Sequence, residues 1–357
     1  MSLCDGDDGL ITCLLAVSGM LDHGKWRTAA VESGELEYSF PLQFVEERTL
    51  LRCSMHEALS SLDWQQRGQL LTHVVKSEDK PLRQGELVLI RAIFLSDSKA
   101  IQDVAREALG DAFMWLCDQT ISDKEIDAQD SLLCLQCLAA FLYRHPRLVT
   151  SRHIPSLLCA ITLQSQRLQP HVGLESTPNL YTALTRVATT LLRTFRPRVA
   201  RYHHILLTTL QSLLHNLFTP YPSDLMAFPA TSSLTSTHAT GYARLLTLLC
   251  DPTPSAAAPP SKYNNSKNSG LVDQVQRAKA ITGEHMQYLL ASYCEYQLEG
   301  KLQPGMKEAL RPALWVVLDC VEQGTLRAMG ASMRDAERSV FRALYGEYNR
   351  AKEAKGR

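Results

Sequence analysis

The sequence predicts an all-α protein. Its apolar residues recur every three or four positions, for example at Leu184, Val187 and Leu191, and this spacing places them on one face of a helix. The sequence lacks the alternating runs of β-branched residues, bounded by hairpin turns, that predict strands. Hydrophobic residues make up 45% of the 357 residues and charged residues 21%, which is the composition of an ordinary globular protein. Together these observations favour a folded chain built from helices.

The same periodicity predicts the helices in order along the chain. An apolar stretch at residues 10–21 follows three aspartates rather than the basic residues of a secretory signal, so we expect a core helix there. Prolines such as Pro146, Pro197 and Pro304 mark helix boundaries because proline has no N–H to donate. Further helices are predicted at residues 42–75, 85–95, 101–116, 130–143, 154–163, 180–195, 198–218, 242–249, 272–298, 306–321 and 332–348.

Short loops between these helices predict an irregular stacked-helix array of HEAT or armadillo type. A clean period of about 40 residues does not align, so the repeat is degenerate or absent. Residues 251–270 contain almost no large apolar side chain, and we expect a disordered, low-complexity insertion there. The predicted organisation is a helical array at 1–217, a long loop at 218–240, a helix at 241–250 that continues the array, a flexible insertion at 251–270, and C-terminal helices at 271–357 that pack on the array.

Motifs of catalysis are missing from the sequence. It has no GxxxxGK[ST] loop, no GxGxxG after a strand, no HExxH and no GxSxG, so we predict no catalytic residue, no cofactor and no small-molecule substrate. Cys134 and Cys137 have CxxC spacing, but no second pair follows at the spacing of metal ligands. We interpret the ten cysteines as reduced thiols, mostly in the core, of a cytosolic or nuclear protein, and we predict no metal site. No apolar run has the length of a membrane span.

Charges are segregated along the chain although they cancel overall. Residues 97–130 carry nine acidic and three basic side chains, whereas residues 144–204 carry nine arginines, no lysine and one acid. Because arginine binds phosphate through paired hydrogen bonds and stacks on bases, the second segment predicts contact with RNA or an acidic partner. The alternative interpretation is that these arginines neutralise the acidic segment or solvate a helix face. The candidate binding residues are Arg186, Arg193, Arg196, Arg198, Arg201, His203 and His204, and the two histidines are expected to form a surface pair.

Three helical segments follow one another in the last third of the chain, at residues 285–293, 310–319 and 338–348, after a related stretch at 239–246. In this order they resemble the C-terminal domain of the nucleolar pre-ribosomal-associated protein 2 family, also called the unhealthy ribosome biogenesis protein 2 family. We expect the residues of this motif to form a structural or partner-binding face. They are Leu289, Tyr293, Leu310, Trp315, Asp319, Arg338, Phe341, Leu344, Tyr345 and Tyr348.

The resemblance implies a non-enzymatic scaffold or assembly factor of the nucleus and nucleolus. Its implied role is in ribosome biogenesis, in early assembly of the large subunit (pre-60S) and in rRNA processing. The implied partners are other ribosome assembly proteins and pre-rRNA, without a membrane. The residues alone leave a second hypothesis open, in which a helical-repeat adaptor of the cytosol or of nuclear transport binds acidic peptides through the same arginines.

Overall fold

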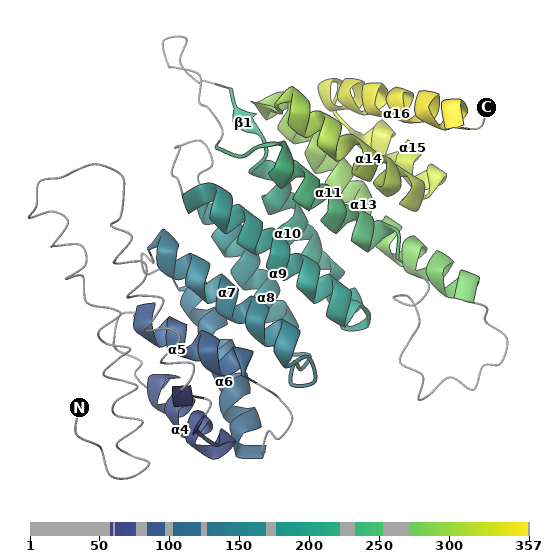
Figure 1. Ribbon diagram of the computed structural model, residues 1–357. Helices are drawn as coiled ribbons and strands as arrows, with labels where there is room; N and C mark the ends of the chain where they lie inside the picture. Colours follow the sequence, from purple (N-terminus) through teal and green to yellow (C-terminus); the bar gives the residue numbers. More distant parts are fainter. Residues whose placement is uncertain are drawn as a thin grey trace, which may run out of the picture. The chain divides into compact units, whose positions relative to one another are not determined.

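The computed structural model describes residues 58–59, 61–75, 84–96, 103–122, 127–168, 176–221, 233–252 and 271–355. They are almost entirely helical (Figure 1). They divide into two compact units, a first unit that ends at His153 and a second that begins at Ile154. The predicted all-α fold of stacked helices is therefore confirmed. The helix expected at 10–21, nearly all of the insertion at 251–270 and the middle of the loop at 218–240 lie outside the described residues.

The described helices of the first unit are α4 (Trp64–Val75), α5 (Gln84–Leu95), α6 (Asp103–Ile121) and α7 (Ala128–Arg144). Helix α4 packs on α6 and α5 packs on α7. Phe94, Phe113 and Phe141 are fully buried between them, and the ring centroid of Phe141 lies 5.1 Å from that of Phe94 and 4.7 Å from that of Phe113. Cys134 and Cys137 are also fully buried, and burial raises the pKa of Cys137 to about 12. Their burial agrees with the interpretation of this CxxC pair as core thiols.

His145 follows α7 and is buried beside these aromatic rings. Its Nε2 lies 2.9 Å from the carbonyl oxygen of Phe94, which can only accept, so Nε2 carries the hydrogen. The Nδ1 atom is buried and has no hydrogen-bond partner among the described residues. Burial lowers the pKa of His145, the hydrogen bond to Phe94 opposes this effect, and the charge of Arg144 lowers the pKa further. The folded first unit therefore favours the neutral form of this histidine.

Acidification is expected to destabilise the first unit through His145. The unfolded chain takes up the proton at about pH 6.5, before the folded chain does, so the stabilisation is complete above that pH and declines as the pH falls. One such proton lowers the free energy of unfolding by at most about 1.4 kcal/mol per pH unit. Hydrogen exchange of α5 and α7, corrected for intrinsic rates, should show this loss as the pH falls below about 6.5. His145→Gln, which keeps an N–H donor, should flatten the dependence, and an unchanged slope in that variant would contradict the assignment.

The second unit contains α8 (His153–Arg167, from Ile154 onward), α9 (Ser176–Val199), the 3₁₀ turn η1 (Ala200–Tyr202), α10 (His203–His215), α11 (Ser236–Cys250), α13 (Leu271–Glu299), α14 (Pro304–Cys320), α15 (Gln323–Ser332) and α16 (Asp335–Lys355). Two series of helices pack in sequence order, α9 on α11 on α14, and α10 on α13 on α16 (Figure 1). A hydrogen bond of 2.8 Å between the hydroxyls of Thr162 and Thr209 joins α8 to α10. Two series of this kind are typical of stacked helical hairpins.

Buried tyrosine hydroxyls connect the two series. Tyr181 of α9 donates to the carbonyl oxygen of Leu213 at 3.1 Å, and Tyr242 of α11 donates to that of Leu210 at 2.9 Å. Both tyrosines are fully buried, so these bonds satisfy hydroxyls that burial would otherwise leave unpaired. Two short strands, β1 (Thr219–Pro220) and β2 (Gly300–Lys301), pair antiparallel, and β2 directly follows the end of α13.

Several helix boundaries differ from the sequence prediction, and two of them are explained by capping contacts. The loop expected to reach residue 240 gives way to α11 at Ser236, because the backbone N–H of Thr235 donates to Nδ1 of His238 at 3.0 Å and caps the helix. The last helix, expected from Ser332, begins at Asp335, where the carboxylate of Glu337 accepts from the backbone N–H of Arg334 at 3.2 Å. Ser332 instead ends α15, a helix that the periodicity did not predict.

The break that the sequence predicts at Arg196 and Pro197 is present as a kink inside α9. Helix α9 extends to Val199, but Phe195 inside it has non-helical backbone angles, φ −126° and ψ 21°. Proline removes one N–H and crowds the preceding turn, so Pro197 bends the helix here. The bend redirects the last turn of α9, which carries Arg196 and Arg198, toward η1 and α10.

Candidate functional site

The seven candidate residues of the arginine segment lie on consecutive elements of the second unit. We call the set the arginine corner, and it comprises Arg186, Arg193, Arg196 and Arg198 of α9, Arg201 of η1, and His203 and His204 of α10. The four arginines at 186, 193, 198 and 201 are exposed, as is His204. The other two members, Arg196 and His203, are turned into the fold.

Arg196 stabilises the end of a neighbouring helix. Its guanidinium donates to the carbonyl oxygen of Leu249 at 3.2 Å and also to that of Leu248, in the last turn of α11. Carbonyls in a last helical turn have no partner within their own helix, and the negative end of the helix dipole attracts a cation. Burial lowers the pKa of Arg196. This arginine therefore has a structural role as a helix cap, which neither interpretation of the arginine segment predicted.

His203 is buried, so the expected surface pair of histidines is wrong. Its ring stacks on that of His285 of α13, with centroids 5.0 Å apart, and its Nδ1 lies 2.7 Å from the carbonyl oxygen of Ala200. Burial lowers the pKa of His203. Only His204 faces solvent, because consecutive residues of a helix point about 100° apart.

The solvent-facing part of the corner is basic. Arg186 and Arg193 are seven residues apart on α9, so they leave the same face two turns from each other. The guanidinium of Arg198 lies 5.8 Å from the ring centroid of Phe195, a cation–π contact. Arg201 adds another exposed guanidinium on η1. The surface can therefore offer several planar donor groups to an anionic partner.

Residues of the C-terminal motif divide between core and surface. Leu289 and Leu310 are fully buried, and Tyr293 is 3% exposed. Trp315 is half-buried, and its indole nitrogen has no hydrogen-bond partner in the described ranges. Leu344 is also buried. These positions hold α13, α14 and α16 together.

A polar contact joins the ends of α14 and α16. The hydroxyl of Tyr348 donates to Oδ1 of Asp319, and Nζ of Lys352 lies 3.3 Å from the same oxygen and 2.9 Å from the tyrosine hydroxyl. Asp319 is exposed, so these contacts contribute little to the free energy of folding, although they join α14 to α16.

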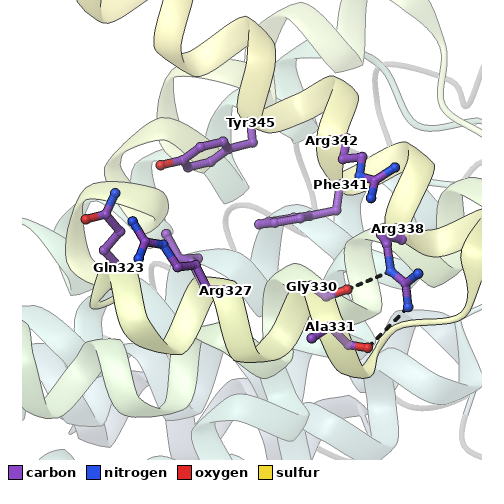
Figure 2. Close-up of a pocket in the computed structure, with 9 residues that line it drawn as sticks. Gln323, Arg327, Gly330, Ala331, Arg338, Phe341, Arg342 and Tyr345 are labelled. Atoms are coloured by element: carbon purple, nitrogen blue, oxygen red, sulfur yellow. Dashed lines mark hydrogen bonds between the residues drawn. The ribbon is translucent and has the colours of Figure 1, made fainter.

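A groove of about 640 Å³ lies between α15 and α16 (Figure 2). Phe341 and Tyr345 project from α16 toward α15, and their rings stack with centroids 5.9 Å apart. Arg338 donates to the carbonyl oxygens of Gly330 at 2.8 Å and Ala331 at 3.2 Å, which ties the end of α15 to α16. The sequence singled out three of these residues, but it did not predict the groove, because α15 was not predicted.

The described residues carry a basic corner on α9, η1 and α10 and an aromatic groove between α15 and α16. They contain no group of three or more histidine, cysteine or acidic side chains placed to hold a metal ion. In the same residues, no helix has both the length and the apolar character that crossing a membrane requires. The fold defines the class as an all-α protein of stacked helices.

A family model identifies the chain more closely. The model of the Urb2/Npa2 family matches residues 132–357, and the chain belongs to this family. The match extends from α7 to the C-terminus, so it contains the arginine corner and the groove. Comparisons with curated proteins and with solved structures find no match. The resemblance read from the C-terminal segments is confirmed, and the Urb2/Npa2 family is a ribosome biogenesis family and not a known enzyme family.

Proposed function

We propose that the chain is a nucleolar, non-enzymatic scaffold for early assembly of the large ribosomal subunit and for processing of its pre-rRNA. The observation that carries this proposal is the family match over residues 132–357. Stacked helices suit such a role because they present long surfaces to several partners at once. The partners are other assembly proteins and pre-rRNA.

The arginine corner is the proposed contact with pre-rRNA. Four exposed arginines and one exposed histidine lie along α9, η1 and the start of α10, within a segment of nine arginines and one acid. Guanidinium groups bind phosphates through paired hydrogen bonds, and each phosphate they neutralise releases counterions. Affinity for RNA at this surface should therefore fall steeply as salt rises.

Affinity purification of the tagged chain from nuclear extract at two salt concentrations tests the proposal. We expect pre-rRNA and large-subunit assembly proteins to co-purify, with less RNA retained at the higher salt. Recovery of cytosolic transport or coat proteins without rRNA precursors would overturn it.

The corner itself is tested by binding purified chain to a single-stranded pre-rRNA fragment over a range of salt. The triple variant Arg186→Ala, Arg193→Ala and Arg201→Ala should reduce the slope of log affinity against log salt by about 2, since each lost contact with single-stranded RNA removes about 0.7. The matched control is Arg244→Ala, Lys307→Ala and Arg350→Ala, three exposed cations elsewhere on the second unit. Equal slopes in both triple variants would remove the corner as the RNA contact.

A further inference from the structure

The groove between α15 and α16 has a charge bias that the fold does not use. Arg327, Arg338 and Arg342 line it, and none of its lining residues is acidic. Arg338 is occupied at the end of α15, where it also lies 3.0 Å from Oδ1 of Asp335. The side chains of Arg327 and Arg342 are exposed and take part in no hydrogen bond or ion pair with the described residues. Two cations are thus available to an anionic occupant.

These two cations flank an apolar floor. Figure 2 shows Arg327 and Arg342 on opposite sides of the Phe341 ring, which points into the groove. Leu326 of α15 and Tyr345 of α16 complete the floor. The groove is open beside Gly330, which has no side chain. A Cβ at that position would lie 3.6 Å from the ring of Phe341 and would occupy the space next to the ring.

The aromatic rings are arranged to receive an apolar side chain rather than a base. Stacking of a base requires a free ring face, whereas Phe341 is only 8% exposed and already stacks on Tyr345. The ring of Tyr348 lies 5.8 Å from Tyr345 on the next turn of α16. Recessed aromatic residues with arginine at the rim are typical of the anchor pockets of protein interfaces.

We propose that the α15–α16 groove binds an acidic segment of a partner protein. One apolar side chain of that segment enters against Leu326, Phe341 and Tyr345, and carboxylates on either side of it pair with Arg327 and Arg342. This inference rests on the proposed function, since it gives the scaffold a protein-binding site separate from the arginine corner. The charge of the rim and the recessed floor together select an acidic, amphipathic segment.

Site-specific photo-crosslinking in the full chain tests this proposal. Gln323 is exposed and lines the groove, so p-benzoylphenylalanine at that position places the reactive group at its edge. After irradiation of the purified assembly complex, mass spectrometry of the crosslinked peptide should identify a segment with carboxylates around an apolar residue. A synthetic copy of that segment should bind the wild-type chain about tenfold more tightly than it binds the variant that carries Arg327→Glu and Arg342→Glu.

Arg350→Glu is the matched control, because Arg350 is exposed on α16 and does not line the groove. It should leave the crosslink yield within about twofold of the wild-type value, and the thermal midpoints of all variants should agree, since exposed charges contribute little to stability. A crosslink to RNA or to a basic segment overturns the proposal, as does a crosslink that survives the double charge reversal. Absence of a crosslink in a complex that still contains pre-rRNA and assembly proteins overturns the groove while leaving the proposed function intact.

Discussion

Replacing Gly283 by alanine is expected to lower the free energy of unfolding of the second unit by about 3 kcal/mol. Gly283 is buried in α13, where that helix crosses the end of α14. A Cβ at this position would overlap the backbone carbonyl oxygen of Cys320 and lie 3.3 Å from the Cα of Val321. Backbone atoms cannot rotate away as a side chain can, so α13 and α14 would have to move apart.

The matched control is Gly346→Ala in α16, where an added Cβ would meet no atom within 4 Å. Alanine is the better helix former, so this variant should be more stable than the wild type by about 0.5–1 kcal/mol. Urea unfolding of the full chain measures the free energy of unfolding of both variants. Hydrogen exchange of α13 and α14 then shows whether the loss in Gly283→Ala is located at these two helices. Equal stability of the Gly283→Ala variant and the wild type would mean that α13 and α14 do not approach as closely as the structure shows.

Periodicity predicted the helices that bury a continuous apolar stripe. Leu184, Val187 and Leu191 are all fully buried on α9, as their spacing indicates. Helix α15 was missed because only Leu326 and Met329 are buried along its ten residues, which is too few to form a pattern. The start of α11 was missed for a different reason: its N-cap is Thr235, but the third helical residue is His238 and not the glutamate or glutamine of the usual capping box.

Counting charges located the arginine corner but could not assign a role to each member. Arg196 and Arg198 are two residues apart in the sequence, yet the first caps α11 and the second is exposed. His203 and His204 divide in the same way. Which side chain turns inward depends on the bend at Phe195 and on the position of α11, and both are properties of the packed fold.

The C-terminal motif illustrates the same limit. Its residues were predicted to share one structural or partner-binding face, and their order in the sequence was enough to indicate the family. Their roles differ in the structure, since Leu310 is in the core, Asp319 binds Tyr348 across two helices, and Phe341 lines a groove. The groove depends on two helices that meet only in the folded chain, so no spacing within either helix predicts it.

Arg196→Ala is expected to separate the structural role of the arginine corner from its proposed role in binding RNA. The substitution removes charge-assisted hydrogen bonds to the carbonyls of Leu248 and Leu249, and should lower the free energy of unfolding by about 2 kcal/mol. Arg193→Ala, a change to an exposed arginine one turn earlier on α9, should alter it by less than about 0.5 kcal/mol. Urea unfolding gives both values.

RNA binding should show the opposite order of effects in the same two variants. Arg193 faces solvent, so its loss should reduce the salt dependence of RNA affinity by the contribution of about one phosphate. Arg196 has its guanidinium directed at the end of α11, so its loss should leave that slope unchanged at temperatures where the second unit remains folded. If Arg196→Ala instead proved as stable as the wild type and lost RNA affinity, the guanidinium would be a phosphate ligand and not a helix cap. If both expectations hold, the arginine that caps α11 does not bind RNA, and only the exposed arginines of the corner are available to pre-rRNA.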